Sequence, residues 1–95
     1  MPTYASFVDL ENRDVQNAQE LASVWGEVGN ELEEFGATIL DAYAMLGEYD
    51  FLVIYEAPDH EGAFKSSLTL GRHGLACQTV EVVDVDDFAH MVEDF

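Results

Sequence analysis

Residues 47–59 read GEYDFLVIYEAPD, and this stretch decides how the rest of the chain is interpreted. The first four residues have the composition of a turn, because Gly47 supplies the positive φ that tight turns need and Asp50 can bond nearby amides. Phe51 to Tyr55 are apolar at every position, which is typical of a central strand covered on both faces. Pro58 then stops the strand. The stretch therefore predicts a turn, a central strand and its end.

On both sides of this strand, period-two alternation predicts further strands over residues 3–10, 37–46 and 75–85. Between the first two, a helix is predicted with Asn12 or Asp14 as its N-cap and Gly36 in a left-handed C-terminal cap. Its apolar stripe recurs at three- and four-residue steps. The stripe consists of Val15, Ala18, Leu21, Ala22, Trp25, Val28, Leu32 and Phe35.

A second helix is predicted to start at the N-cap Asp59 and to close at residues 71–74, which contain two glycines. It holds Ala63, Phe64, Ser67, Leu68 and Leu70. After the last strand, Asp86 or Asp87 is expected to cap a final short helix. The apolar residues of that helix are Phe88, Met91, Val92 and Phe95.

The resulting order is βαββαβ with a short C-terminal helix, in a single domain over residues 1–95. This order predicts the α+β fold called the ferredoxin-like sandwich, in which two helices cover one face of a four-stranded antiparallel sheet. A central strand that is apolar on both sides needs a cover for the second face. A second copy laid sheet to sheet is the simplest cover, so we expect a homodimer.

The charge balance is extreme, with 20 Asp and Glu against 3 Lys and Arg and a net charge of −17. Such a surface cannot replace the counterions of phosphates, so we expect no nucleic-acid partner and no anionic membrane partner. The acids could serve a basic partner or adapt the chain to concentrated salt. They are spread along the whole sequence, and molar salt shortens the Debye length to about 3 Å. Both points favour the halophilic interpretation.

We expect a cytoplasmic location. No apolar run approaches the roughly 18 residues that span a bilayer. The start, residues 1–5, lacks the basic and hydrophobic regions of a signal peptide. A lone Cys77 leaves no internal disulfide, which fits a reducing compartment.

The stretch 47–59 resembles the signature of the GYD family, a Gly-x-Tyr-Asp turn that runs into an apolar strand and a Glu-Ala-Pro-Asp ending. Residues 1–4, Gly36, Tyr43 and Gly74 are similar to the family's pattern as well. The resemblance implies a ferredoxin-like subunit of the dimeric α/β-barrel kind and little about activity. Residues 75–78 are uncharged where the family usually carries a basic residue, which argues against an anion site there.

Five residues are candidates for binding a small ligand: Tyr43, Tyr49, Asp50, Arg72 and His73. A tyrosine and a carboxylate at a strand start can hold a ligand hydroxyl, and a histidine in a helix-ending loop can face a cleft. Three of them also have a specific structural interpretation. Asp50 can bond the amides of its own turn, Tyr49 can pack over it, and His73 can bond the last carbonyls of its helix.

No metal or other cofactor is expected, and no catalytic residue is assigned. The histidines at 60, 73 and 90 lack zinc-site spacing, and the acids of residues 84–94 lack the EF-hand pattern. Cys77 has no basic neighbour in sequence and is expected to be an inert core thiol.

Three functions stay open. The expected one is a non-enzymatic module that binds a small molecule or a partner protein. The alternatives are a small oxygenase, isomerase or cyclase with a pocket between sheet and helices, and a purely structural dimeric subunit.

Overall fold

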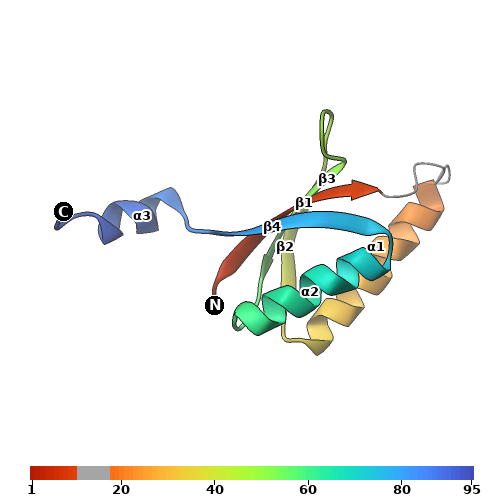
Figure 1. The fold of residues 1–95 in the computed structure, drawn as a ribbon, viewed down its shortest axis with the longest axis horizontal. Coiled ribbons are helices and arrows are strands. Elements are labelled where there is room, and N and C mark those ends of the chain that lie inside the picture. The colour runs from red at the N-terminus through yellow and green to blue at the C-terminus, as the bar shows by residue number, and fades with distance from the viewer. Residues whose placement is uncertain (11–17) are drawn as a thin grey trace.

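Two helices lie against one side of a four-stranded antiparallel sheet (Figure 1), which confirms the predicted α+β, ferredoxin-like architecture. The structure is a computed structural model, and it describes residues 1–10 and 18–95. The elements are β1 (Thr3–Leu10), α1 (Ala18–Glu34), β2 (Thr38–Ala44), β3 (Phe51–Glu56), α2 (His60–Arg72), β4 (Leu75–Val82) and α3 (Val85–Met91). The predicted N-caps Asn12 and Asp14, and Val15 of the stripe, lie outside the described residues.

The strands run in the order β2-β3-β1-β4, so β1 and β3 occupy the centre. Tyr4 pairs with Tyr55 on one side and with Glu81 on the other, while Phe7 pairs with Leu52. Because side chains alternate along a strand, the row of Tyr4 faces the helices and the row of Phe7 faces away from them. These are the two faces that the alternation in residues 3–10 predicts.

Helix α1 supplies the centre of the core through Val28 and Leu32, which are fully buried. Trp25 packs edge-on against Phe51 of β3, with ring centroids 5.3 Å apart. Ala22 was expected in this stripe but is exposed. Val24 packs against the core instead, since it continues the four-residue row of Val28 and Leu32.

The buried side of α2 consists mostly of small or hydroxyl-bearing residues and includes one large apolar side chain, Leu70. The others are Gly62, Ala63, Ser66 and Thr69. Ser66 Oγ donates to the carbonyl oxygen of Gly62 at 2.8 Å, which satisfies the buried hydroxyl within the helix. Phe64 and Leu68 point outward and are exposed. The predicted cap at Asp59 is confirmed, because its Oδ1 accepts from Gly62 N at 2.8 Å.

Three predicted boundaries differ in the structure. Strand β2 is shorter than residues 37–46, and β4 ends at Val82 instead of continuing to residue 85. The N-cap of α3 is Asp84, whose Oδ1 accepts from Asp86 N at 2.7 Å, so Asp86 and Asp87 were wrong as caps. The cap must precede the first helical residue, and that residue is already Val85.

Candidate functional sites

The five predicted ligand residues do not share a cavity. Tyr43 pairs with Leu52 in the sheet, and the Tyr49 ring lies 5.3 Å from that of Phe7, so both tyrosines belong to the side away from the helices. Arg72 and His73 lie at the end of α2, on the helix side. The sheet therefore separates the two tyrosines from Arg72 and His73.

Asp50 ties the β2–β3 connection to the end of β1. Its Oδ2 accepts a hydrogen bond from Leu10 N at 2.8 Å, and its own N–H donates to the Val8 carbonyl oxygen at 2.8 Å. This amide partner of the carboxylate is thus on a neighbouring strand, 40 residues away in sequence. Asp50 positions this turn against the sheet.

Arg72 and His73 meet a carboxylate of α1. Glu31 Oε2 lies 2.6 Å from Arg72 Nη2 and 3.1 Å from His73 Nε2, and Glu27 Oε2 lies 3.9 Å from His73 Nδ1. Hydrogen bonding from His73, and then from Arg72, holds the pKa of Glu31 below its ordinary value of 4.5. The ion pair between Arg72 and Glu31 and the hydrogen bond between His73 and Glu31 join the two helices.

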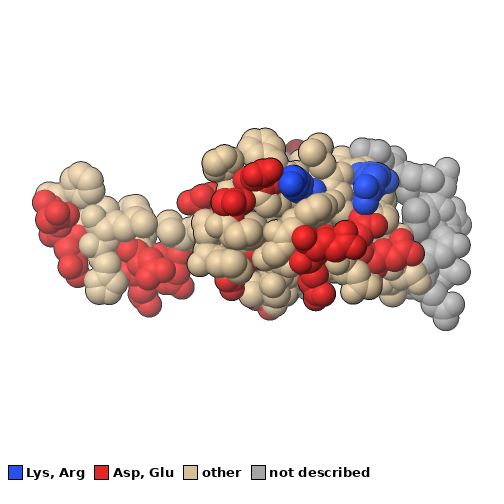
Figure 2. All heavy atoms as spheres, turned by 90° about the horizontal axis from the view of Figure 1, so that it is seen from below, with Lys and Arg blue, Asp and Glu red and all other residues tan. Residues whose placement is uncertain are grey.

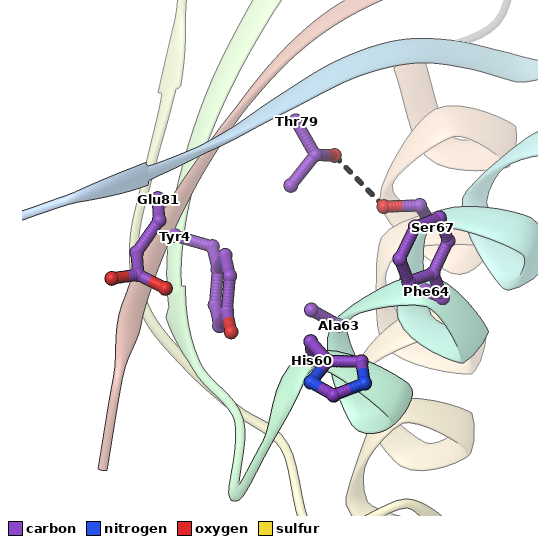
Figure 3. Close-up of a pocket in the computed structure, with 7 residues that line it drawn as sticks. All are labelled: Tyr4, His60, Ala63, Phe64, Ser67, Thr79 and Glu81. Carbon is purple, nitrogen blue, oxygen red and sulfur yellow. Dashed lines mark hydrogen bonds between the residues drawn. The ribbon is translucent and has the colours of Figure 1, made fainter.

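A cavity of about 130 Å³ opens between β1, β4 and the first half of α2 (Figure 3). It is lined by Tyr4, His60, Ala63, Phe64, Ser67, Thr79 and Glu81. Tyr4 and Glu81 come from adjacent strands at the same register level, so both side chains emerge on the helix side. None of the five predicted ligand residues lines this cavity.

A chain of hydroxyls forms one wall of the cavity. Thr79 Oγ1 lies 2.7 Å from Ser6 Oγ and 2.8 Å from Ser67 Oγ, which connects β1, β4 and α2. Figure 3 shows the bond between Thr79 and Ser67. Each hydroxyl therefore has a partner, and the wall is fixed in place by the fold itself.

Tyr4 differs from these hydroxyls. The residue is only 6% exposed, and its ring stacks on that of Tyr55 with centroids 5.6 Å apart. The Tyr55 hydroxyl donates to the Ala63 carbonyl oxygen at 3.3 Å, whereas no described residue forms a hydrogen bond with the Tyr4 hydroxyl. Burial, the Glu81 carboxylate, Tyr55 and Asp59 together raise the pKa of Tyr4 above 10.0, so the phenol stays protonated at neutral pH.

Sequence reasoning missed this cavity, although a partial signal was present. The alternation in residues 3–10 already placed Tyr4 on one face with Ser6 and Val8. What the sequence lacks is the register between β1 and β4, which pairs Tyr4 with Glu81 and brings His60 near both. That register depends on tertiary packing between segments far apart in the chain.

The sheet face away from the helices is apolar at its centre. Phe7, Leu52 and Ile54 are half-buried there, and Val80 and Tyr43 are exposed. Tyr49 crosses part of this face and donates from its hydroxyl to Gln78 Oε1 at 3.1 Å. We refer to this surface, formed by Phe7, Tyr43, Tyr49, Leu52, Ile54 and Val80, as the open sheet face.

The last residues form a projecting arm, residues 83–95, which contains α3 and stands off from the rest of the fold (Figure 1). None of the α3 residues is buried. Val85 is 78% exposed, Phe88 54%, Met91 58% and Phe95 100%. Val85, Phe88 and Met91 share one side of α3 at helical spacing and Phe95 follows the helix, so the arm carries an apolar strip that no described residue buries.

The described part of the chain contains neither a candidate metal site nor a candidate membrane span. No group of three or more His, Cys, Asp or Glu residues within it is arranged to hold a metal ion. None of its helices combines the length and apolarity that crossing a membrane requires. Cys77 is half-buried, and its Sγ donates weakly to the Ser67 carbonyl oxygen at 3.7 Å.

The chain is similar to known proteins over nearly its whole length. Residues 4–92 match the GYD domain family. A protein of Thermus thermophilus is 32% identical over 89 residues, which are 92% of this chain and 94% of that protein. The Thermus protein is named the glutamine synthetase and cystathionine beta-lyase binding protein.

Proposed function

The chain belongs to the GYD domain family, and on that premise we propose that it is a non-enzymatic interaction module that binds a metabolic enzyme. The observation that carries the proposal is the projecting arm, whose apolar strip is exposed while its own fold buries none of α3. Amphipathic helices of this kind bind by laying the apolar side into a groove of the partner. The name of the Thermus relative points to glutamine synthetase and cystathionine beta-lyase as the partners to test.

The open sheet face supports a second part of the proposal, a homodimer formed sheet to sheet. Large apolar surfaces on small domains usually mark an interface. A twofold pair would cover Phe7, Ile54 and Val80 of each copy with the same residues of the other. In this arrangement both arms stay free for the enzyme, since they leave the fold beyond the end of β4.

We propose further that the module works in the cytoplasm of a salt-accumulating cell. Figure 2 shows acidic side chains over both the main body and the α3 end of the face that it draws. They are dispersed and do not form one block, which suits a surface whose self-repulsion is screened by salt. An acidic patch for one basic partner would be concentrated at a single place.

The test compares two variants that add the same charge to α3. Phe88→Asp places a carboxylate within the apolar strip, and His90→Asp places one on the other side of the helix. Binding to glutamine synthetase and to cystathionine beta-lyase from the same organism is measured by calorimetry in molar KCl. We expect Phe88→Asp to weaken binding by about tenfold or more and His90→Asp to leave it near that of the original chain. Equal affinities for the two variants, or no binding of either enzyme by the original chain, would contradict the proposal.

The dimer is tested separately by light scattering in molar KCl. Val80→Asp puts a charge into the open sheet face and should give the mass of one chain, while Phe88→Asp should keep the mass of two. A single-chain mass for the unaltered protein would rule out the sheet-to-sheet pair without affecting the result for the arm.

A further inference from the structure

The cavity beside Tyr4 contains an unused hydrogen-bonding group. Tyr4 is more than nine-tenths buried, its hydroxyl points along the cavity toward Ala63 and His60 (Figure 3), and no described residue bonds to it. The hydroxyl oxygen is accessible from the cavity and is not sealed inside the core, so water or a ligand in the cavity can bond to it. The neighbouring hydroxyls of Thr79 and Ser67 already bond each other and do not compete for it.

The electrostatic surroundings of this hydroxyl favour a positive ligand. Glu81 contributes a carboxylate to the lining, and the lining residues include no lysine or arginine. The positive end of α2 lies close by, but the carboxylate of its N-cap Asp59 already accepts from Gly62 N and offsets that end. Burial is the main cause of the raised pKa of Tyr4, and the carboxylates of Glu81 and Asp59 raise this pKa further, as a negative potential would.

The remaining lining is suited to a short hydrocarbon chain. Ala63 and the rings of Tyr4 and Phe64 supply apolar surface, and aromatic ring faces attract cations as well. Phe64 is exposed, so its ring lies at the mouth and not within the core. A volume of about 130 Å³ holds a few water molecules or a small organic group, and it is too small for a nucleotide or another large metabolite.

We propose that this cavity binds a primary alkylammonium group, from either a free small amine or the end of a lysine side chain. The ammonium donates to the Tyr4 oxygen and pairs with the Glu81 carboxylate, and its alkyl chain lies between Ala63 and Phe64. The proposal does not depend on the dimer or on the arm, because all the lining residues belong to one copy of the fold.

The experiment is a titration of the full-length protein with n-butylammonium chloride at constant ionic strength, followed by amide chemical shifts in NMR. The expected result is saturable shifts at Ala63 and Thr79. Two compounds of the same chain length serve as comparisons: n-butanol lacks the charge and butyrate reverses it. Equal shifts with n-butanol, or no saturable shift with n-butylammonium, would overturn the proposal.

Variants identify the groups responsible. Glu81→Gln removes the charge at the cavity and should weaken n-butylammonium binding by roughly threefold or more. The matched control is Glu56→Gln, which alters a strand glutamate on the side of the sheet away from the helices and should leave the affinity unchanged.

Tyr4→Phe removes only the hydroxyl and should weaken binding by roughly fivefold. The amide spectrum of Tyr4→Phe shows whether this variant keeps the fold. If it does not, the comparison of Glu81→Gln with Glu56→Gln tests the proposed site by itself. Equal affinities for these two variants would overturn the assignment.

The two sources of the ammonium are separated with Nα-acetyl-lysine methylamide, which carries the lysine side chain on a peptide-like backbone. Shifts at Ala63 and Thr79 with this compound as well as with n-butylammonium would support the site and assign it to a lysine of a partner protein. Shifts with n-butylammonium alone would support the site and assign it to a free amine.

Discussion

The Glu31 carboxylate on α1 lies 2.6 Å from the Arg72 guanidinium at the end of α2. With His73 bonded to the same oxygen, one acidic side chain links the two helices. In a chain with a charge of −17, carboxylates with a basic partner are the exception. Glu31 therefore makes a different contribution to stability from that of most acids on the surface.

Glu31 is expected to make the stability depend on pH in acid solution. Its pKa is lowered in the folded state, so its contribution is fully present above the ordinary value of 4.5 and is lost as the pH falls through the lower folded value. Melting temperatures measured from about pH 6 to about pH 3 should fall less steeply for Glu31→Gln than for the original chain. Glu33→Gln, on an exposed position of α1, is the control and should follow the original chain. Identical slopes for all three would contradict this role.

Asp50→Ala should destabilise the fold by about 1–3 kcal/mol, because the Leu10 amide would lose its partner at the end of β1. Denaturant unfolding in molar KCl measures the change. Asp41→Ala, at an exposed position of β2, removes the same charge and should stay within about 0.5 kcal/mol of the original. A similar loss for both variants would mean that charge and not the Leu10 bond is responsible.

Two glycine-to-alanine changes should have opposite signs. Gly47 has φ of 130°, and Gly71 lies within α2, while an added Cβ would meet nothing within 4 Å at either position. Gly47→Ala should therefore cost about 1–2 kcal/mol through backbone strain alone. Gly71→Ala should stabilise α2 by up to about 1 kcal/mol. Thermal unfolding distinguishes them, and a neutral Gly47→Ala would show that the turn adopts another conformation.

Removal of residues 84–95, which are all of the projecting arm except Val83, should change the free energy of unfolding by no more than about 0.5 kcal/mol, because α3 buries no residue. Enzyme binding should be lost under the proposed function. A truncated protein that is clearly less stable would instead indicate that the arm packs on the fold, or on a second copy, in solution.

Dialysis into dilute buffer should unfold the protein. At a charge of −17, unscreened repulsion can rival a net stability of about 5–15 kcal/mol. Circular dichroism followed against KCl concentration measures the transition. A spectrum that stays unchanged in dilute buffer would contradict the halophilic interpretation.

The strands could be predicted because each carries its own local pattern. The alternation of residues 3–10 and the apolar run that starts at Phe51 follow from burial of one face or of both, and the positive φ of Gly36 and Gly47 follows from their turns. The orientation of α2 is harder to predict. Besides Leu70, its buried side consists of Gly62, Ala63, Ser66 and Thr69. The two hydroxyls bond within the helix, so residues that look polar in sequence are buried in the fold.

The candidate sites were less accessible to prediction for a related reason. Tyr49 and His73 were predicted as ligand residues from their neighbours in sequence. In the fold, Tyr49 bonds to Gln78 and His73 to Glu31, both more than 25 positions away. Tyr4 was not predicted as a site residue, because the cavity beside it also needs Glu81 and His60. Only the strand register and the packing of α2 bring those two residues to the same cavity. Local pattern defines elements, whereas sites depend on long-range register.

The central position of β1 also constrains how the chain folds. Thr3 pairs with Glu56 on one edge of β1 and with Val82 on the other. Since β1 is made before β3 and β4, its second edge is covered only when β4 has formed. Pairing over such distances in sequence makes folding slow relative to that of helical domains of this size. The backbone groups on that edge of β1 therefore stay unpaired during synthesis until β4 forms. The high negative charge of the nascent chain would keep neighbouring copies from pairing with that edge.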